Sequence, residues 1–295
     1  MVEALGNGVP VGWPTLCDTP PTAHCSFPEL PLLERPSAAK AAGFDAVEFW
    51  WPFDRPSPAD PEVDRFVAAV SDAGVQLVGL NFAAGDMPGG DRGLVSWPRR
   101  AAEFLDSVQT AVGIGERLGT RAFNALYGNR VDGTAPGEQD DLAARNLAAA
   151  ADAAARIGAV VLVEAVSGAP RYPLRTADDV VAVLDRVERE SGAGNLRLLA
   201  DLYHLSVNGD DLDAALDRHH ARIGHVQIAD APGRHEPGTG SLDLDRHLDA
   251  LEAAGYAGWV GLEYAPATTT DAGLDWLPRA RRGAPARAGT AGRTA

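Results

Sequence analysis

Short apolar runs recur along the chain, and their nearly continuous hydrophobicity is typical of strands that are covered on both faces. Each run holds six or seven residues and is followed by a longer segment with helical periodicity. The seven clearest runs are DAVEFW (45–50), VQLVGL (75–80), RAFNAL (121–126), AVVLVEA (159–165), LRLLADL (196–202), IGHVQIA (223–229) and WVGLEY (259–264). An eighth, weaker candidate is TAHCSF (22–27).

The segments between these runs predict helices, because their apolar residues recur with a period near 3.6. Several of these segments end at a glycine just before the next strand, in AAGF, DAGV, RIGA and AAGY, which is the preference of helix C-caps. The predicted helices span residues 58–73, 98–118, 138–157, 176–190 and 243–254.

Eight strands alternating with helices predict a single (β/α)8 barrel. The pattern covers residues 21–278, or 258 residues, which is about 32 per strand and helix. We expect an irregular extension over 1–21, a barrel over 22–278 and a disordered arginine-rich tail over 279–295. An open doubly wound sheet is the alternative, but its glycine-rich signal, GIGERLG, lies within a helical segment rather than after a strand.

Charge narrows the range of partners. The chain has 41 acidic and 26 basic residues and a formal net charge of −15. The tail carries five arginines and no acid, so the remainder has a charge of −15 − 5 = −20. This balance argues against a nucleic-acid partner, which would favour a basic face. No uninterrupted apolar stretch of about 18 residues occurs, so we expect no membrane span.

The scarcity of lysine and cysteine excludes further classes. Lys40 is the only lysine and lies near a predicted helix end, so a Schiff-base aldolase and a Walker A nucleotide site are both excluded. Cys17 and Cys25 cannot form a disulfide framework or a four-cysteine zinc site. The first residues lack the basic and apolar regions of a secretory signal, so we expect a cytoplasmic protein.

Four consecutive predicted strands end in an oxygen-bearing side chain, and in a barrel these ends form the mouth that holds the active site. The residues are Glu164, Asp201, Gln227 and Glu263. A single strand-end acid is more often a helix cap or a surface group. Several acids packed together would repel one another, and a hard divalent cation such as Mg²⁺ or Mn²⁺ would resolve that conflict.

Histidines near these strand ends are candidates for substrate binding. His204 follows Asp201 and faces the same mouth, and His235 lies in the loop after the seventh strand. His225 alternates with Gln227 and either shares its face at a deeper level or is a hydrogen-bonded core histidine. The remaining helical histidines are expected at the surface: His219, His220 and His247.

Five segments resemble the hydroxypyruvate isomerase family, whose members are metal-dependent TIM barrels similar to sugar isomerases. The segments are HVQIADAPGRHEPGTGSLDL, AGYAGWVGLEYAPATTTDAGLDWL, AAKAAGFDAVEFWWPF, NFAAGDMPGGDRG and ADLYH. The resemblance covers residues 24–278. It implies that Glu164 and Glu263 are the acid/base pair and that Glu164, Asp201, Gln227 and Glu263 hold the metal.

The chain departs from the family pattern at several positions. Family members usually have a histidine in place of Asn81, the motif EPIN in place of residues 164–167, and a lysine in place of Ala265. The first strand is short and follows an unrelated proline-rich start. These differences affect the cavity wall and the substrate choice more than the metal ligands.

These observations favour aldose–ketose-type isomerisation of a small oxo acid, such as the interconversion of hydroxypyruvate and tartronate semialdehyde. Arg234, in the loop after Gln227, is the candidate for binding the substrate carboxylate, and a surface pair with Glu236 is its structural alternative. A 2-oxo-tetronate isomerase and a ketose 3-epimerase remain open, while an endonuclease of the same barrel type and a non-enzymatic barrel fit less well. A homo-oligomer also remains open.

Overall fold

The computed structural model describes residues 21–24, 27 and 29–283. Eight parallel strands form a closed barrel in sequence order, and β1 pairs with both β2 and β8. The strands are β1 (Pro21–His24), β2 (Ala46–Phe49), β3 (Gln76–Asn81), β4 (Ala122–Asn124), β5 (Val160–Glu164), β6 (Leu196–Asp201), β7 (Ile223–Ile228) and β8 (Val260–Leu262). The predicted (β/α)8 barrel is therefore confirmed.

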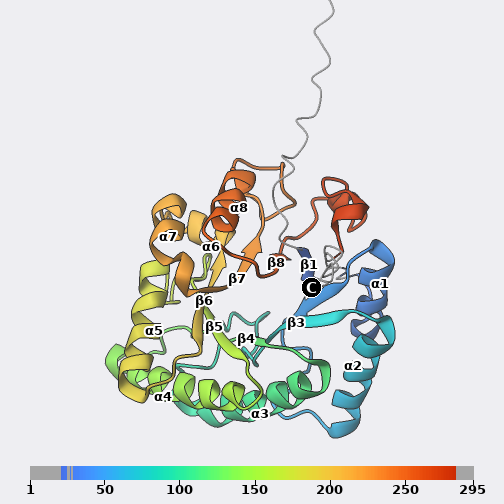
Figure 1. Cartoon of the computed structure of the whole chain (residues 1–295). Coiled ribbons are helices and arrows are strands. Elements are labelled where there is room, and N and C mark those ends of the chain that lie inside the picture. Colours follow the sequence, from blue (N-terminus) through green and yellow to red (C-terminus); the bar gives the residue numbers. More distant parts are fainter. Residues whose placement is uncertain (1–20, 25–26, 28, 284–295) are drawn as a thin grey trace, which may run out of the picture.

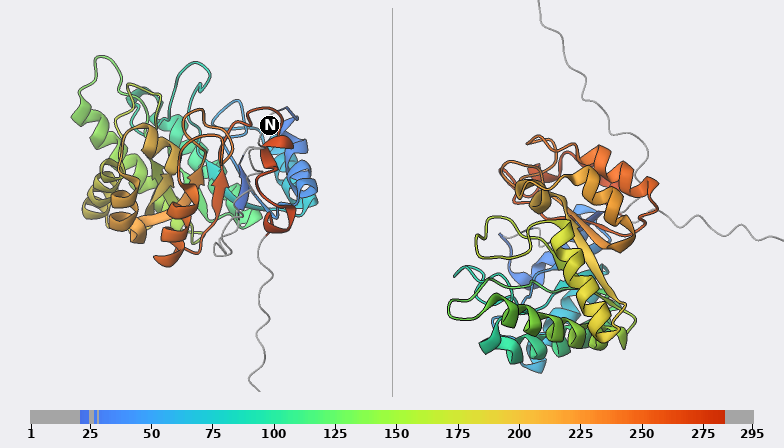
Figure 2. Two further views of the ribbon diagram at one scale, coloured as in Figure 1. Left: turned by 90° about the horizontal axis from the view of Figure 1, so that it is seen from above. Right: turned by 90° about the vertical axis from the view of Figure 1, so that its left-hand side faces the viewer.

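The helices form a ring around the barrel (Figure 1). The helices are α1 (Arg35–Ala42), α2 (Asp60–Ala73), α3 (Ala101–Leu118), α4 (Pro136–Ala155), α5 (Ala177–Ser191), α6 (Leu202–Val207), α7 (Leu212–His219) and α8 (Leu244–Ala253). Short 3-10 helices are η1 (Leu32–Glu34), η2 (Pro98–Arg100), η3 (His220–Arg222), η4 (Ala272–Leu274) and η5 (Arg279–Arg281). The side view in Figure 2 shows long loops gathered at one end of the barrel.

Helix ends follow the sequence signals. Thr176 caps α5 through its side chain, and Asp243 caps α8 in the same way. Gly43 and Gly74 end α1 and α2 in the left-handed conformation. Lys40 lies exposed in the last turn of α1, where it pairs with Asp45.

Two histidines differ from the expectation that helical histidines lie at the surface. His219 and His247 are 8% and 5% exposed, because they face inward from α7 and α8. His219 Nε2 lies 2.5 Å from Asp178 Oδ1, and burial lowers the pKa of His247. Only His220 of the three is exposed.

The first residues of the predicted tail, Arg279–Arg281, form the 3-10 helix η5. Arg282 donates hydrogen bonds to the carbonyl oxygens of Leu277, Ala42 and Leu274, which attach η5 to α1 and η4. An arginine with three backbone acceptors is fixed despite the low-complexity sequence around it. Residues 1–20 and 284–295, together with Cys25, lie outside the described part of the chain.

Candidate active site

Glu164 is the last residue of β5 and lies buried at the mouth of the barrel. The Asn124 side chain at the end of β4 donates a hydrogen bond from Nδ2 to Glu164 Oε1 over 2.6 Å. Burial raises the pKa of Glu164 well above its usual value, and the nearby carboxylates of Glu263 and Asp201 raise it further. The Asn124 hydrogen bond opposes this shift without cancelling it.

Asp201 ends β6 and at the same time caps α6. Its Oδ1 accepts a hydrogen bond from the backbone N–H of His204 over 3.0 Å, which fixes the carboxylate at the strand end. Burial raises the pKa of Asp201 despite the opposing charge of Arg234. Oxygen or nitrogen atoms of Glu164, Asp201 and His204 all lie within 4.8 Å of one another, so these side chains could surround one metal ion.

The imidazole of His204 has a defined orientation. The backbone N–H of Ser167 donates to His204 Nδ1 over 3.1 Å, and Ser167 Oγ lies 2.7 Å from the same nitrogen. Because a backbone N–H is always a donor, Nδ1 must be the acceptor, and the proton of the neutral ring resides on Nε2. Nε2 is 3.6 Å from Asp201 Oδ2, so its proton faces the mouth.

The Gln227 side chain on β7 is hydrogen-bonded to a carboxylate that the sequence pattern did not identify as part of the site. Glu48 on β2 is 2% exposed, and its Oε1 accepts a hydrogen bond from Gln227 Nε2 over 3.0 Å. Its Oε2 lies 2.5 Å from His225 Nε2. His225 is thus the hydrogen-bonded core histidine that was one of its two interpretations.

Two glycines provide the space for Glu48 inside the barrel. A Cβ atom at Gly261 would lie 2.1 Å from Glu48 Oε1, and one at Gly79 would lie 3.2 Å from Glu48 Cβ. With its amide nitrogen turned toward Glu48, Gln227 directs Oε1 away from that carboxylate. Gln227 Oε1 is buried and has no hydrogen-bond partner among the described residues.

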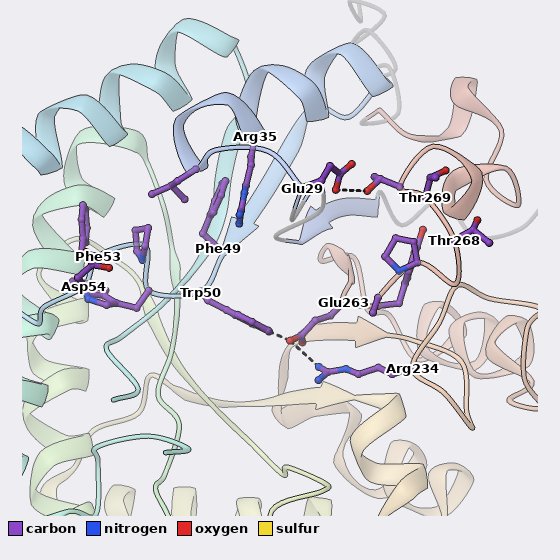
Figure 3. Close-up of a pocket in the computed structure, with 17 residues that line it drawn as sticks. Glu29, Arg35, Phe49, Trp50, Phe53, Asp54, Arg234, Glu263, Thr268 and Thr269 are labelled. Carbon is purple, nitrogen blue, oxygen red and sulfur yellow. Dashed lines mark hydrogen bonds and ion pairs between the residues drawn. The ribbon is translucent and has the colours of Figure 1, made fainter. Parts of the chain in front are cut away.

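Glu263 follows β8 and completes the set of strand-end side chains. Figure 3 shows that Trp50 and Arg234 approach its carboxylate from two sides. Trp50 Nε1 donates to Glu263 Oε1 over 3.1 Å, and an Arg234 guanidinium nitrogen lies 2.9 Å from the same oxygen. Arg234 is also 3.8 Å from Asp201 Oδ2 and lies over the ring of Tyr203.

Arg234 therefore reaches the strand ends, and its pairing differs from the surface pair with Glu236 that was the alternative. Burial alone would lower the pKa of Arg234, but the carboxylates of Glu263 and Asp201 outweigh it and leave the pKa raised. Arg234 has a φ of +60°, within the left-handed region. Glu236 instead accepts a hydrogen bond from the backbone N–H of Ala267.

His235 is the predicted site residue that the structure does not bring to the cluster. Its Nδ1 lies 2.7 Å from the carbonyl oxygen of Ala265, in the segment after β8. It lines neither of the two cavities at the mouth. Arg234 contacts Glu263, whereas its neighbour in the sequence, His235, is hydrogen-bonded to the backbone carbonyl of Ala265.

Two cavities meet at the mouth and share six lining residues: Trp50, Trp51, Phe53, Asp54, Arg234 and Glu263. One has a volume of about 850 Å³ and reaches Glu164 and His204. The other, drawn in Figure 3, has a volume of about 800 Å³ and is largely apolar, with walls from the segments after β2 and β8. The catalytic candidates therefore line the first cavity.

Sequence reasoning missed Glu48, Asn124 and Trp50. Asn124 satisfied the rule that found the others, because it is a polar residue where a strand ends. Glu48 also had a signal, as a lone acid within a strand that is otherwise apolar. Trp50 carried none, because its contact with Glu263 joins residues 213 positions apart.

Comparisons with known proteins agree with this fold. Residues 36–280 match the family model described as "Xylose isomerase-like TIM barrel". The chain belongs to this family. It is 56% identical over 263 residues to a Streptomyces coelicolor protein named "Putative hydroxypyruvate isomerase", covering 88% of this chain and 94% of that protein.

Two further relatives extend the comparison. A 2-oxo-tetronate isomerase of Cupriavidus necator is 35% identical over 258 residues and matches 85% of this chain and 94% of its own length. A crystal structure titled "AP endonuclease, family 2" from Brucella melitensis superposes with a TM-score of 0.78 and 33% identity, covering 88% of this chain and 97% of that one. The resemblance to hydroxypyruvate isomerases is confirmed, and the chain is an isomerase of this family. Across the described residues, no helix is long and apolar enough to cross a membrane.

Proposed function

We propose that the protein interconverts hydroxypyruvate and tartronate semialdehyde with the help of a divalent metal ion. The observation that carries this proposal is that Glu164, at the end of β5, and Glu263, directly after β8, line one cavity together with His204. Two carboxylates facing one small molecule can move a proton between its adjacent carbons. The 56% identity to the Streptomyces coelicolor protein supports hydroxypyruvate as the substrate.

The donor set fits Mg²⁺ or Mn²⁺. Gln227 Oε1 is a buried acceptor without a partner among the described residues, and the pKa values of Glu164 and Asp201 are raised by burial and by the nearby carboxylate of Glu263. A divalent cation would satisfy the amide oxygen and offset the repulsion. We assign the metal to Glu164, Asp201, Gln227 and Glu263.

In this proposal, His204 binds the substrate rather than the metal. Its Nδ1 accepts from the Ser167 backbone, so the neutral ring has its proton on Nε2 and offers no lone pair there. That N–H can donate to a carbonyl or hydroxyl oxygen of the substrate. Gln227, whose oxygen is unpartnered, supplies the fourth metal ligand in its place.

When bound, the metal would polarise the substrate carbonyl and stabilise negative charge on the adjacent oxygens. Glu263 is held by Trp50 and Arg234, both of which stabilise its carboxylate form, the form that accepts a proton from carbon. Glu164, which lines the same cavity, gives a proton to the neighbouring carbon, while the hydroxyl proton passes to the former carbonyl oxygen. Proton exchange with solvent then restores both glutamates. Arg234 was expected to bind the substrate carboxylate, but its guanidinium already pairs with Glu263 and lies 3.8 Å from Asp201, so its charge is engaged.

A 2-oxo-tetronate is the second candidate substrate. The Cupriavidus necator relative carries that name, and the cavity of about 850 Å³ leaves room for a fourth carbon. A ketose 3-epimerase would use the same two glutamates. An endonuclease is disfavoured because His204 is the single histidine of the metal-ligand cluster found among the described residues, and the net charge is −15.

The test is a substrate assay of the purified protein, stripped of metal and then supplied with Mn²⁺ or Mg²⁺. Hydroxypyruvate, 2-oxo-tetronates, free ketoses and abasic-site DNA are compared at equal concentrations. We expect metal-dependent turnover with kcat/KM highest for hydroxypyruvate. A higher value for a 2-oxo-tetronate or a ketose would transfer the assignment to that substrate.

A further inference from the structure

The cavity that contains Glu164 and His204 is lined by four arginines: Arg55, Arg92, Arg100 and Arg234. Three of them have carboxylate partners. Arg100 pairs with Asp91 and Glu103 at 2.8 and 2.7 Å. Arg55 is 3.4 Å from Glu62, and Arg234 is 2.9 Å from Glu263.

Arg92 is the exception. Within the described part of the chain, its guanidinium makes hydrogen bonds only to the carbonyl oxygens of Met87 and Asp91, at 3.0 and 2.7 Å, and pairs with no acid. Both bonds come from one nitrogen, Nη1, so the remaining N–H groups stay available. A half-buried cation without a counter-ion in the cavity of a strongly acidic protein calls for an anion from outside.

The loop that carries Arg92 is held in place by its own hydrogen bonds. The backbone N–H of Gly93 donates to Ala84 O, and the backbone N–H of Asp86 donates to the Asp91 carboxylate. Gly93 has a φ of +109°, and a Cβ there would lie 1.9 Å from Leu126 O. The backbone that positions Arg92 is therefore fixed before any ligand arrives, which lowers the entropic cost of binding.

We propose that Arg92 binds the carboxylate of the oxo-acid substrate and is the main determinant of acid over neutral sugar. This inference rests on the proposed function, since it places the substrate's carboxylate at Arg92 and its reacting carbons between Glu164 and Glu263. Arg234, whose charge is engaged by Glu263 and Asp201, then positions Glu263. A fork of N–H donors can form two parallel bonds to one carboxylate.

The experiment compares two substrates that undergo the same proton shift. Hydroxypyruvate has a carboxylate where dihydroxyacetone has a CH₂OH group, and each becomes an aldehyde by moving a proton between adjacent carbons. The variants are Arg92→Met, which removes the charge, and Arg92→Lys, which keeps the charge but loses the fork. Arg99→Met, an exposed arginine that does not line the cavity, is the matched control.

For Arg92→Met we expect kcat/KM for hydroxypyruvate to fall about 10- to 100-fold, mainly through KM, the scale of losing hydrogen bonds to a charged group. Turnover of dihydroxyacetone should change less than about threefold, because only the bond to the carboxylate is lost. Arg92→Lys should lie between wild type and Arg92→Met, and Arg99→Met should match wild type. Arg234→Met should lower the turnover of both substrates.

Equal losses for both substrates, or no loss for hydroxypyruvate, would overturn the role of Arg92 while leaving the isomerase intact. If the wild type does not turn over hydroxypyruvate, the proposed function fails, and binding then decides the role of Arg92. D-glycerate, an unreactive acid, should raise the Tm of metal-loaded wild type but not of Arg92→Met, while glycerol should shift neither. A D-glycerate shift that survives in Arg92→Met, or is absent from both proteins, would reject the inference.

Discussion

At the scale of single residues, three side chains of the site are each oriented by a partner on another strand or loop. Asn124 holds Glu164, Ser167 holds His204, and Glu48 holds Gln227. Such supporting partners determine the geometry of a metal or proton-transfer site as much as the reacting groups do. Replacing a reacting group and replacing its supporting partner should therefore have different effects.

The acid/base pair gives the first prediction. Glu164→Gln and Glu263→Gln should each lower kcat at least about 10²-fold, because each removes a group that transfers a proton. Because these residues are also the proposed metal ligands, activity is measured at saturating Mn²⁺ alongside the metal content of each variant. A variant that keeps wild-type kcat would remove that residue from the mechanism.

Glu48 gives the second prediction, as a positioning residue. In Glu48→Gln an amide replaces the carboxylate between Gln227 and His225, so the Gln227 amide loses its fixed orientation. We expect Mn²⁺ affinity to fall about 10- to 100-fold, which is the usual effect of losing an outer partner of a metal ligand. Calorimetric titration of the metal-free protein measures this.

The matched control for Glu48→Gln is Glu116→Gln, on the exposed face of α3. A merely structural role of Glu48 would lower Tm without changing Mn²⁺ affinity in the fraction that remains folded. Unchanged affinity in Glu48→Gln would therefore contradict the positioning role.

At the scale of elements, the loop between β7 and α8 is organised by one buried acid. Asp230 is 1% exposed, and its two carboxylate oxygens accept four backbone N–H groups. The donors are Ala231, Gly238, Gly240 and Leu242, all within 3.0 Å. This arrangement fixes the loop that presents Arg234 to Glu263.

Asp230→Asn is the third prediction. Its amide nitrogen cannot accept hydrogen bonds, so two of the four N–H groups lose a charged acceptor, at a cost of about 1.5–3 kcal/mol each. We expect a clear drop in Tm and a lower kcat because Arg234 is displaced. Thermal unfolding and steady-state kinetics measure both, with the exposed Asp217→Asn as control. Wild-type kcat at normal Tm would show that the loop does not depend on this carboxylate.

At the scale of the whole molecule, several buried carboxylates lie together at the mouth of the barrel. Without a metal ion, their burial and repulsion raise the free energy of the folded state. Glu164 and Asp201 have raised pKa values in the folded state, chiefly through burial. The folded protein thus binds these protons more tightly than the unfolded chain does. Their contribution to stability is present at low pH and is lost as pH rises through the folded pKa values.

Metal removal is the fourth prediction. Chelation should abolish activity and lower Tm, because a ligand bound only by the folded state stabilises it. The rise in Tm on adding Mn²⁺ should be larger at about pH 7.5 than at about pH 5, since protons replace the metal as pH falls. Unchanged activity after verified metal removal would reject the metal's role, and a rise in Tm that is independent of pH would reject the carboxylate ligands.

The barrel and the residues at its strand ends could be predicted from the amino-acid sequence alone. Periodicity is local, so every predicted strand overlaps an observed one, and the end of each strand marks the mouth whatever the packing. Glu164, Asp201 and Gln227 lie at or next to these ends, and Glu263 directly follows β8. Arg234 was predicted because it lies in the loop after Gln227.

Which of these residues interact follows from the three-dimensional packing of the barrel. The contacts of Glu48 with His225 and Gln227 join residues 177 and 179 positions apart, and the burial of His219 and His247 depends on which helix face meets the barrel. No sequence pattern distinguishes Arg92 from the other arginines of the cavity. The difference is that the other three pair with acidic side chains. Closing the barrel brings distant strands together, and no local pattern encodes those pairings.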